Sequence, residues 1–235
     1  MLVIKEVFKN YKNQKVLNGV TFNVAAGEIK GLIGVNGAGK STLVDIICGV
    51  KKNNSGEIFI NGTNIKDKKS IRQLKFNLGY MPQRFSLFND LSVEENLSYL
   101  CTVYNLDKSN IEKTMEKCHL IEHRKTLAKN LSGGYKQLLS LAGAIIHSPN
   151  LLILDEPTAS MDPIFRRKFW KIINSFKQTK TTVLVITHYM EELVECDNFV
   201  CLSKGRVSFN GSLDEYKKDG MINIEQLLQK YVLED

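Results

Sequence analysis

The first third of the chain has the pattern of strands separated by tight turns. Residues 2–4 (LVI) and 20–24 (VTFNV) are short stretches of β-branched and other apolar residues, which favour strands. Residues 57–60 (EIFI) run directly into Asn61-Gly62, a pair that favours a two-residue hairpin turn. We therefore expect an antiparallel sheet near the N-terminus.

Three further segments predict strands of another kind. Residues 151–154 (LLIL) and 182–186 (TVLVI) are short, almost continuously apolar runs, as expected for strands covered on both faces. Residues 29–33 predict a buried strand that opens into a glycine loop and then a helix over residues 41–48. This order is typical of an α/β core.

The segment from residue 91 to 148 is predicted to be mainly helical. Ser92 and Glu95 have the spacing of a capping box, and Ser109 and Glu112 repeat it. After the first box, four apolar residues recur at helical spacing and share one face. They are Val93, Leu97, Leu100 and Tyr104.

Two helices are expected later in the chain. Asp162-Pro163 predicts a helix start, with a capping carboxylate followed by proline in the first turn. A final short helix is expected after residues 212–215 (SLDE). The whole pattern indicates an α/β core interrupted by a helical insert, with an antiparallel sheet at the front.

Composition and charge add limits to this picture. The chain has 235 residues, 43% hydrophobic and 24% charged, and a net charge of +7. These values are ordinary for a soluble globular protein, and the positive balance suits either acidic partners or a solvated lysine-rich surface. No apolar run approaches the ~20 residues that span a bilayer, and the start lacks a signal peptide's apolar run. We expect a cytoplasmic protein with reduced thiols.

A phosphate-binding loop is the first chemical motif. Residues 34–41 (GVNGAGKS) match G-x-x-x-x-G-K-[ST]. Backbone N–H groups of such a loop point at phosphates, and the following helix adds its positive end. Lys40 is expected to reach the β- and γ-phosphates, and Ser41 to offer its hydroxyl to Mg²⁺. The other expected nucleotide-binding residues of this loop are Asn36, Gly37, Ala38, Gly39 and Thr42.

Two adjacent acids follow the apolar run at residues 151–154. Burying Asp155 and Glu156 together is costly unless a cation lies there. Asp155 suits Mg²⁺, usually through water, and Glu156 is placed to polarise an attacking water. By themselves they could equally be solvated acids leaving the sheet at Pro157. Next to a phosphate loop, we favour the catalytic interpretation.

A third motif, residues 131–137 (LSGGYKQ), carries the most specific information. Ser132, Gly133 and Gly134 fall at a predicted helix start, where free amides and a hydroxyl suit an anion. The loop at residues 34–41 covers only one side of a triphosphate. We therefore interpret the heptad as a second phosphate binder, which acts on a nucleotide held by another subunit.

With these motifs in this order, the chain resembles the ATP-binding subunits of ATP-binding-cassette (ABC) transporters over nearly its whole length. The resemblance implies a P-loop NTPase (RecA-like) α/β core. Residues 1–85 and 150–235 would form the core with its N-terminal antiparallel β subdomain. Residues 86–149 would form the inserted α-helical subdomain, and the whole would be one ABC ATP-binding domain.

The resemblance also assigns residues that are uninformative alone. Tyr11 looks like the aromatic that stacks on adenine. Gln83 looks like the glutamine that contacts Mg²⁺ and links the core to the helical insert. His188 looks like the switch histidine that senses the γ-phosphate, so that Glu156, His188, Lys40 and Gln83 would form the catalytic set. Leu138 departs from the pattern, because many relatives carry Arg at this position.

Within the family, three segments resemble the exporter-type branch called ABC-2. They are residues 84–97, 161–170 and 188–192. The implied partners are integral membrane transporter subunits and a second ATP-binding subunit, identical or not, with ATP and Mg²⁺ as cofactors. The subunit would then lie peripherally on the cytoplasmic face of the cell membrane.

Phe85, Leu87 and Phe88 are the predicted docking residues for a short helix of a membrane subunit, although ordinary core packing would also explain them. Other functions stay open: an importer subunit, or a non-transport ABC ATPase acting on nucleic acid or ribosomes. The 48 residues from Gln83 to Leu131 are too few for a long coiled-coil arm, and no aromatic–basic interleaving indicates nucleic acid. A small GTPase would lack a use for the heptad. We expect no nucleic-acid partner.

Overall fold

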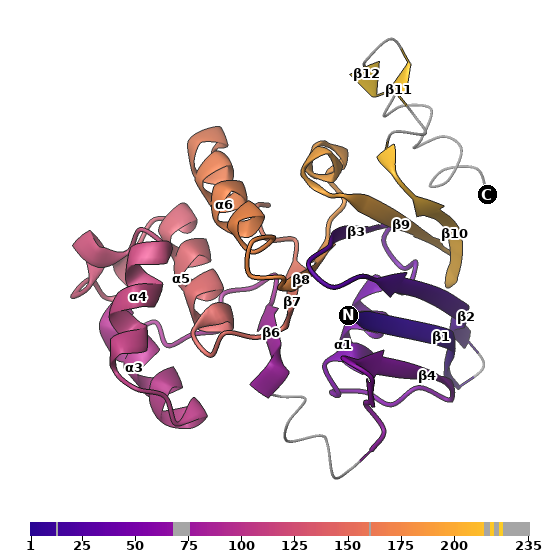
Figure 1. Cartoon of the computed structure of the whole chain (residues 1–235), viewed down its shortest axis with the longest axis horizontal. Coiled ribbons are helices and arrows are strands. Elements are labelled where there is room, and N and C mark those ends of the chain that lie inside the picture. The colour runs from indigo at the N-terminus through magenta and orange to yellow at the C-terminus, as the bar shows by residue number, and fades with distance from the viewer. Residues whose placement is uncertain (13, 68–75, 160, 214–216, 219–220, 223–235) are drawn as a thin grey trace.

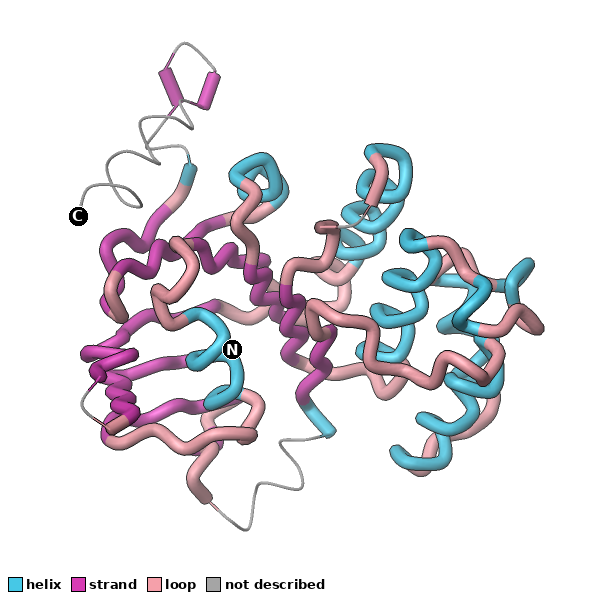
Figure 2. Tube along the Cα trace, turned by 180° about the vertical axis from the view of Figure 1, so that it is seen from behind, coloured by secondary structure: helices cyan, strands magenta, loops and turns pink. Residues whose placement is uncertain are grey.

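The computed structural model describes residues 1–12, 14–67, 76–159, 161–213, 217–218 and 221–222. Two sheets and a group of helices make up most of the molecule (Figure 1). The helices α3, α4 and α5 lie at one end and the sheets at the other, with α6 between them. The view from behind shows the same separation of helical and strand-rich parts (Figure 2).

The smaller sheet is the antiparallel sheet expected near the N-terminus. Its strand order is β2-β1-β4-β5. Asn61 and Gly62 both have positive φ, 49° and 81°, which is the backbone of a tight hairpin turn with the right-handed twist of its strands. The bounds are Leu2–Tyr11 for β1, Gln14–Val24 for β2, Ser55–Ile60 for β4 and Thr63–Asn64 for β5.

The larger sheet has the order β10-β9-β3-β8-β7-β6, and all neighbours except β10 run parallel. It contains the three buried strands that the apolar runs predict. The bounds are Ile29–Ile33 for β3, Leu78–Met81 for β6, Leu151–Asp155 for β7, Thr182–Ile186 for β8, Asn198–Ser203 for β9 and Arg206–Gly211 for β10.

The apolar runs are continuous because each central strand packs side chains into a hydrophobic core on both faces of the sheet. Leu151 and Ile153 of β7 join a core with the small sheet and helix α1 (Lys40–Ile47). Leu152 and Leu154 point the other way, into a core with the helices. Successive side chains of a strand alternate between faces, so a strand covered on both faces needs apolar residues throughout. The fold class expected from sequence is confirmed.

The helical part contains α3 (Val93–Tyr104), α4 (Ser109–Lys117) and α5 (Gly133–Ile145). Two short 3₁₀ turns, η1 (Ile121–His123) and η2 (Ala128–Asn130), lie between α4 and α5. The first predicted capping box is confirmed: the Glu95 N–H donates to Ser92 Oγ at 3.2 Å, and the Ser92 N–H donates to Glu95 Oε2 at 2.7 Å.

The second predicted capping box is wrong. Ser109 is already inside α4, whose N-cap is Lys108. The acceptor at this helix start is Asp107, whose Oδ1 takes the Ser109 N–H at 2.8 Å. Glu112 turns away to pair with Arg124. An aspartate two residues upstream supplies the oxygen that the serine would have offered.

Helix α6 (Pro163–Ser175) starts as predicted, because Asp162 Oδ1 accepts the N–H groups of Ile164 and Phe165 at 2.8 and 3.0 Å. The 3₁₀ helix η3 (Met190–Glu195) precedes β9. The predicted C-terminal helix falls mostly outside the described residues. Within them lie two short paired strands, β11 (Lys217–Lys218) and β12 (Met221–Ile222). Among the described residues, no helix is long and apolar enough to cross a membrane.

Candidate nucleotide site

The phosphate loop joins β3 to α1 in a backbone path that requires glycine. Gly39 caps the helix with φ of 105°, a left-handed conformation that side chains rarely adopt. A Cβ at Gly39 would lie 2.8 Å from the Val16 carbonyl oxygen, and one at Gly34 would lie 2.2 Å from the Leu202 carbonyl oxygen. Glycine is therefore required at positions 34 and 39 for two reasons: the backbone has positive φ, and a Cβ would clash with a neighbouring carbonyl oxygen.

Lys40 is buried against this loop. Its Nζ donates to the carbonyl oxygens of Gly34 at 2.6 Å and Val35 at 3.1 Å. Burial lowers the pKa of the Lys40 ammonium, while the carboxylates of Glu156 and Asp155 act to raise it. A phosphate would replace these carbonyl contacts with a charge-assisted hydrogen bond, which is the stronger kind.

The loop borders a cavity of about 520 Å³ that brings together most of the nucleotide-site residues expected from sequence. The two acids at the end of β7, Asp155 and Glu156, line this cavity together with the loop and Gln83. Its lining consists of Gln14, Val16, Asn36, Gly37, Gly39, Lys40, Ser41, Thr42, Gln83, Asp155, Glu156 and Ile186.

Glu156 is held by side chains from two other segments. Gln83 Nε2 donates to Glu156 Oε2 at 2.6 Å, and His188 Nδ1 lies 2.9 Å from Glu156 Oε1. The backbone of Glu156 has φ of 48°, and its N–H donates to the Ile186 carbonyl at 2.8 Å. A non-glycine residue in this conformation costs about 1–3 kcal/mol, a strain that clusters at functional sites. The sheet thus aims this carboxylate.

Asp155 ends β7 in a partly buried position beside Glu156. Burial and the neighbouring charge of Glu156 raise the pKa of Asp155, while Tyr80 and Lys40 act to lower it. Tyr80 OH donates to Asp155 Oδ2 at 3.3 Å. The cavity therefore holds excess negative charge opposite the phosphate loop, which is a suitable environment for a cation.

Six of the expected site residues do not line this cavity: Tyr11, Ala38, His188 and the heptad residues Ser132, Gly133 and Gly134. Ala38 turns its side chain into the core under the small sheet, and His188 contacts the lining residue Glu156. Lys9 Nζ and Lys51 Nζ lie over the Tyr11 ring, at 4.9 and 5.5 Å from its centroid. The Tyr11 side chain is 39% exposed and does not line the cavity.

The heptad at residues 131–137 lies apart from the cavity, at the start of α5. Ser132 is the N-cap, and its Oγ accepts the Tyr135 N–H at 3.5 Å. Ser132 and Gly133 are exposed, and none of the heptad's residues lines the cavity. Gly134 has a packing role: a Cβ there would lie 2.6 Å from the Phe165 ring of α6.

Leu138, the departure from the family pattern, has a structural explanation. It is fully buried in the core that joins the helices to the large sheet. An apolar side chain there contributes about 1.5–3 kcal/mol of burial. The residue therefore packs the helix behind the heptad instead of reaching solvent.

Sequence reasoning missed three lining residues: Gln14, Val16 and Ile186. Val16 also provides the carbonyl that requires Gly39. Ile186 provides the carbonyl that holds the Glu156 backbone. These roles use main-chain atoms and shape, which leave no signal in residue type. Only the closeness of Gln14 to Tyr11 in sequence could have indicated it.

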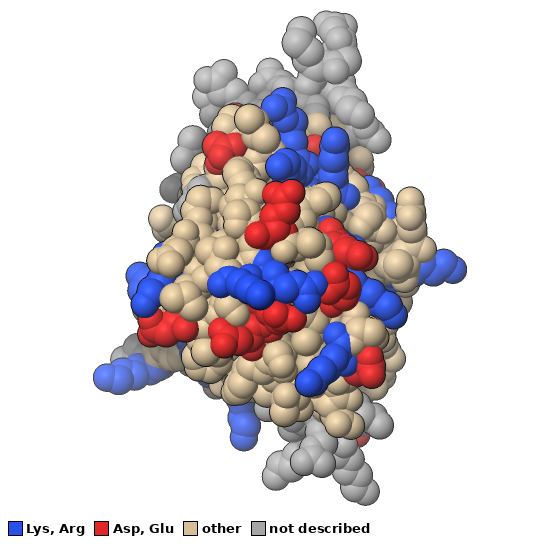
Figure 3. Space-filling model, turned by 90° about the vertical axis from the view of Figure 1, so that its left-hand side faces the viewer, with Lys and Arg blue, Asp and Glu red and all other residues tan. Residues whose placement is uncertain are grey.

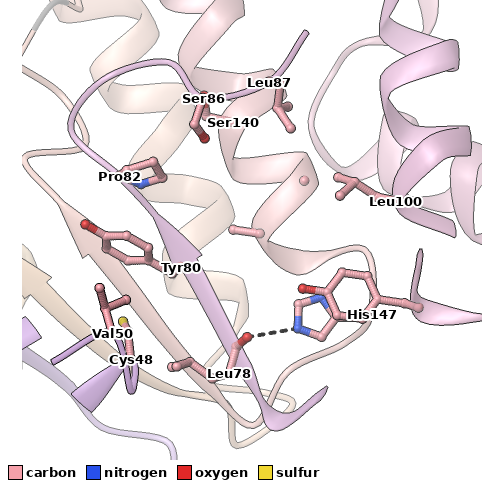
Figure 4. A pocket seen from close by; sticks show the side chains of 13 residues that line it. Cys48, Val50, Leu78, Tyr80, Pro82, Ser86, Leu87, Leu100, Ser140 and His147 are labelled. Atoms are coloured by element: carbon pink, nitrogen blue, oxygen red, sulfur yellow. Dashed lines mark hydrogen bonds between the residues drawn. The ribbon is translucent and has the colours of Figure 1, made fainter. Parts of the chain in front are cut away.

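A second cavity, of about 370 Å³, lies between the large sheet and the helical part (Figure 4). Leu78 and Tyr80 of β6 form one wall, and Leu100 of α3 and His147 after α5 form the other. Its remaining lining is Cys48, Val50, Pro82, Ser86, Leu87, Tyr104, Ser140, Gly143 and Ala144. His147 Nε2 contacts the Leu78 carbonyl at 3.1 Å and its ring stacks on Tyr104 at 4.1 Å. We name this cavity the interlobe groove.

The three predicted docking residues differ in their surroundings, so docking and core packing do not explain all of them equally. Phe85 and Leu87 are half-buried and pack against the core of the helices, as the core-packing alternative expects. Phe88 is 48% exposed and meets Tyr99 edge to face at 5.0 Å. Leu87 also lines the interlobe groove.

A glycine phosphate loop between a buried strand and a helix, with two acids at the end of a parallel strand, defines the class of phosphate-loop nucleotide hydrolases. Comparison with known proteins then gives the family. The model of the ABC transporter family matches residues 17–159. The chain belongs to the ABC transporter family.

Individual relatives agree with this assignment. The lantibiotic transport ATP-binding protein SrtF of Streptococcus pyogenes is 33% identical over 99% of this chain and 98% of its own length. The probable multidrug ABC transporter ATP-binding protein YbhF of Escherichia coli is 37% identical over 91% of this chain. The aligned part spans only 37% of YbhF. A solved structure described as the ATP binding subunit of an ABC transporter superposes with a TM-score of 0.86 at 30% identity, covering 97% of this chain and 98% of that one.

Proposed function

We propose that this chain powers an exporter-type ABC transporter, binding and hydrolysing ATP on the cytoplasmic face of the membrane. The observation that carries the proposal is the catalytic set at the cavity: Glu156, fixed by Gln83 and His188, faces the phosphate loop. The names of SrtF and YbhF, lantibiotic transport and multidrug transport, support export of a small peptide or a drug-like compound.

In the proposed mechanism, Glu156 accepts a hydrogen bond from the attacking water and so orients it toward the γ-phosphate. A carboxylate in this role contributes about 10²–10⁴-fold to rate. Gln83 and His188 hold both its oxygens, so the carboxylate is oriented before ATP arrives. Lys40 turns from the carbonyls of its own loop to the phosphates and offsets their charge.

Mg²⁺ fits the same cavity. Ser41, Gln83 and Asp155 line it together and offer the oxygen ligands that Mg²⁺ prefers, with water completing the coordination. Burial and the charge of Glu156 raise the pKa of Asp155, and a cation beside it would favour the carboxylate. When bound with ATP, Mg²⁺ would neutralise phosphate charge.

The heptad supports a head-to-tail dimer. Ser132 and Gly133 present an exposed helix start away from their own chain's cavity. Free N–H groups at a helix start suit a phosphate. In the proposed dimer, the heptad of one chain covers ATP held by the phosphate loop of the other. ATP then joins the two chains, and hydrolysis releases them.

The interlobe groove is the proposed docking place for a cytoplasmic segment of the membrane subunit. Its walls are largely apolar, and its edge includes Val50, which is 72% exposed. Pro82 and Ser86, which flank Gln83 in the sequence, line the groove together with residues of helices α3 and α5. A segment in this groove would therefore move with Gln83, which contacts Glu156.

A nucleic-acid function has less support. Figure 3 shows basic and acidic side chains interspersed over the visible face of the helical part. Arg124 pairs with Glu94 and Glu112, and Lys129 pairs with Asp90. A nucleic-acid path needs an excess of basic side chains along a track.

Recovery of the tagged chain from membranes tests the proposal. We expect it to co-purify with an integral membrane subunit. Val50→Asp should remove the membrane subunit and leave ATP binding intact. The matched control is Val194→Asp, at a valine that is 59% exposed and outside the groove lining. This control variant should still co-purify with the membrane subunit. Recovery with ribosomes or DNA, or equal behaviour of both variants, would contradict the proposal.

A further inference from the structure

A buried acid, Glu192, lies behind the hydrolysis site. It belongs to η3 and is only 1% exposed, although its neighbours Glu191 and Glu195 are exposed. Glutamate is almost never fully buried unless it is paired, because desolvating a carboxylate costs free energy. An acid in this position therefore calls for a structural reason.

Two buried threonine hydroxyls face this carboxyl. Thr158 Oγ1 donates a short hydrogen bond to Glu192 Oε1. Burial raises the pKa of Glu192, while Thr158, Thr187, Arg166 and His188 act to lower it. Both threonines are 0% exposed. Among the described residues, Glu192 Oε2 has no hydrogen-bond partner.

The two threonines come from the segments that carry the catalytic pair. Thr158 lies two residues after Glu156, and Thr187 directly precedes His188. Thr187 Oγ1 accepts the Tyr189 N–H at 2.9 Å, which leaves the hydroxyl proton available for the carboxyl. The buried Glu192 side chain thus lies next to both segments, the one that carries Glu156 and the one that carries His188.

We propose that Glu192 is a positioning residue for ATP hydrolysis: its carboxyl holds Thr158 and Thr187 so that Glu156 and His188 keep their 2.9 Å contact. An apolar side chain could fill the same space, but it could not accept from either hydroxyl. The inference rests on the proposed roles of Glu156 and His188.

The test separates the hydrogen bond from packing. Thr158→Val keeps the shape of the side chain and removes its hydroxyl, whereas Thr158→Ser keeps the hydroxyl. We expect kcat for ATP to fall about tenfold in Thr158→Val and in Glu192→Met, which removes both acceptor oxygens, as a small misplacement of a catalytic group does. Thr158→Ser should stay within about twofold of wild type, with KM for ATP changed by no more than about twofold throughout.

Two further variants complete the experiment. The double variant Thr158→Val/Glu192→Met should lose no more activity than Glu192→Met alone, because the Glu192 change already removes the contact with Thr158. Glu195→Gln, an exposed acid of the same helix, should match wild type. All variants are measured on the full chain, with melting temperatures recorded beside the kinetics.

Specific results would overturn the inference. These are wild-type kcat in Thr158→Val and Glu192→Met, equal losses in Thr158→Ser and Thr158→Val, or losses that multiply in the double variant. A fall in melting temperature with a parallel rise in KM would show a merely structural role. Glu156→Gln, run alongside, tests the proposed site itself: if it still hydrolyses ATP, that site is wrong whatever the Glu192 variants do.

Discussion

The phosphate loop and the heptad at residues 131–137 are both helix starts suited to phosphate, yet their surroundings differ. The phosphate loop borders a cavity with a buried lysine and two carboxylates. The heptad presents Ser132 and Gly133 to solvent, and none of its residues lines that cavity. We therefore propose that the first region binds a nucleotide by itself. The second offers backbone N–H groups and a hydroxyl, and in the proposed dimer it meets a phosphate held by the other chain.

The largest effect is expected at the carboxylate that the phosphate-loop region positions. Glu156→Gln should lower kcat about 10²–10⁴-fold, because an amide cannot accept the proton of the attacking water. ATP affinity should change little, since Lys40 and the loop glycines are untouched. Phosphate release and equilibrium binding of a fluorescent ATP analogue measure the two quantities. Retained hydrolysis would place the catalytic acid elsewhere.

The next effect sharpens the contrast at the heptad. Gly133→Asp places a negative charge at the first residue of α5, where a γ-phosphate would bind. Turnover should fall about tenfold to a hundredfold, while the first capture of ATP by the monomer stays unchanged. The fold should tolerate the change, because an acid at a helix N-terminus is favourable by about 0.3–1 kcal/mol. A loss of ATP capture equal to the loss of turnover would break the comparison.

A smaller effect separates phosphate binding from packing within the heptad. Gly134→Ala should lower the free energy of unfolding by about 1–3 kcal/mol, because the new methyl would lie 2.6 Å from the Phe165 ring. Gly133→Ala, at the exposed neighbouring position, should change it by less than about 1 kcal/mol. Urea unfolding followed by circular dichroism measures both. Equal losses would argue against the packing role of Gly134.

The smallest effect concerns pH. Burial raises the pKa of Glu192 above its ordinary 4.5, so the folded state binds this proton more tightly than the unfolded chain. Glu192 should therefore make stability fall as pH rises from about 4.5 through the raised pKa. Glu192→Gln should remove this part of the slope. Urea unfolding of both proteins across that range tests it, and parallel curves would contradict the assigned shift.

Much of the fold was predictable because its signals are local. Residues 151–154 and 182–186 are apolar throughout since their strands serve two cores, and the loop at residues 34–41 is constrained by phosphate geometry. Strand β6 gave no such signal, because Gly79 interrupts its short apolar pattern. That glycine is set by a distant contact: a Cβ there would lie 2.2 Å from the Ala144 carbonyl.

The site was predictable where side-chain chemistry fixes residue type, and not where tertiary packing decides. Lys40, Asp155 and Glu156 were identified from their motifs. Glu192 lies in the acidic stretch at residues 191–195, which resembles a solvated helix face in sequence. Its burial depends on Thr158 and Thr187, which lie in the segments that follow β7 and β8. The Ser109 capping box failed because Ser109 is already the first residue of α4, and its N–H is accepted by Asp107, two residues upstream.

The central claim is that one chain's heptad completes the ATP site of another, and mixing two inactive variants tests it most directly. Lys40→Met removes the phosphate-loop charge, and Gly133→Asp blocks the heptad. A head-to-tail pair of the two contains one intact site, made of the phosphate loop from the Gly133→Asp chain and the heptad from the Lys40→Met chain. We predict that mixing restores hydrolysis to roughly a quarter of the wild-type rate, given random pairing in a two-site dimer. Activity no greater than that of the separate variants would contradict a site shared between chains.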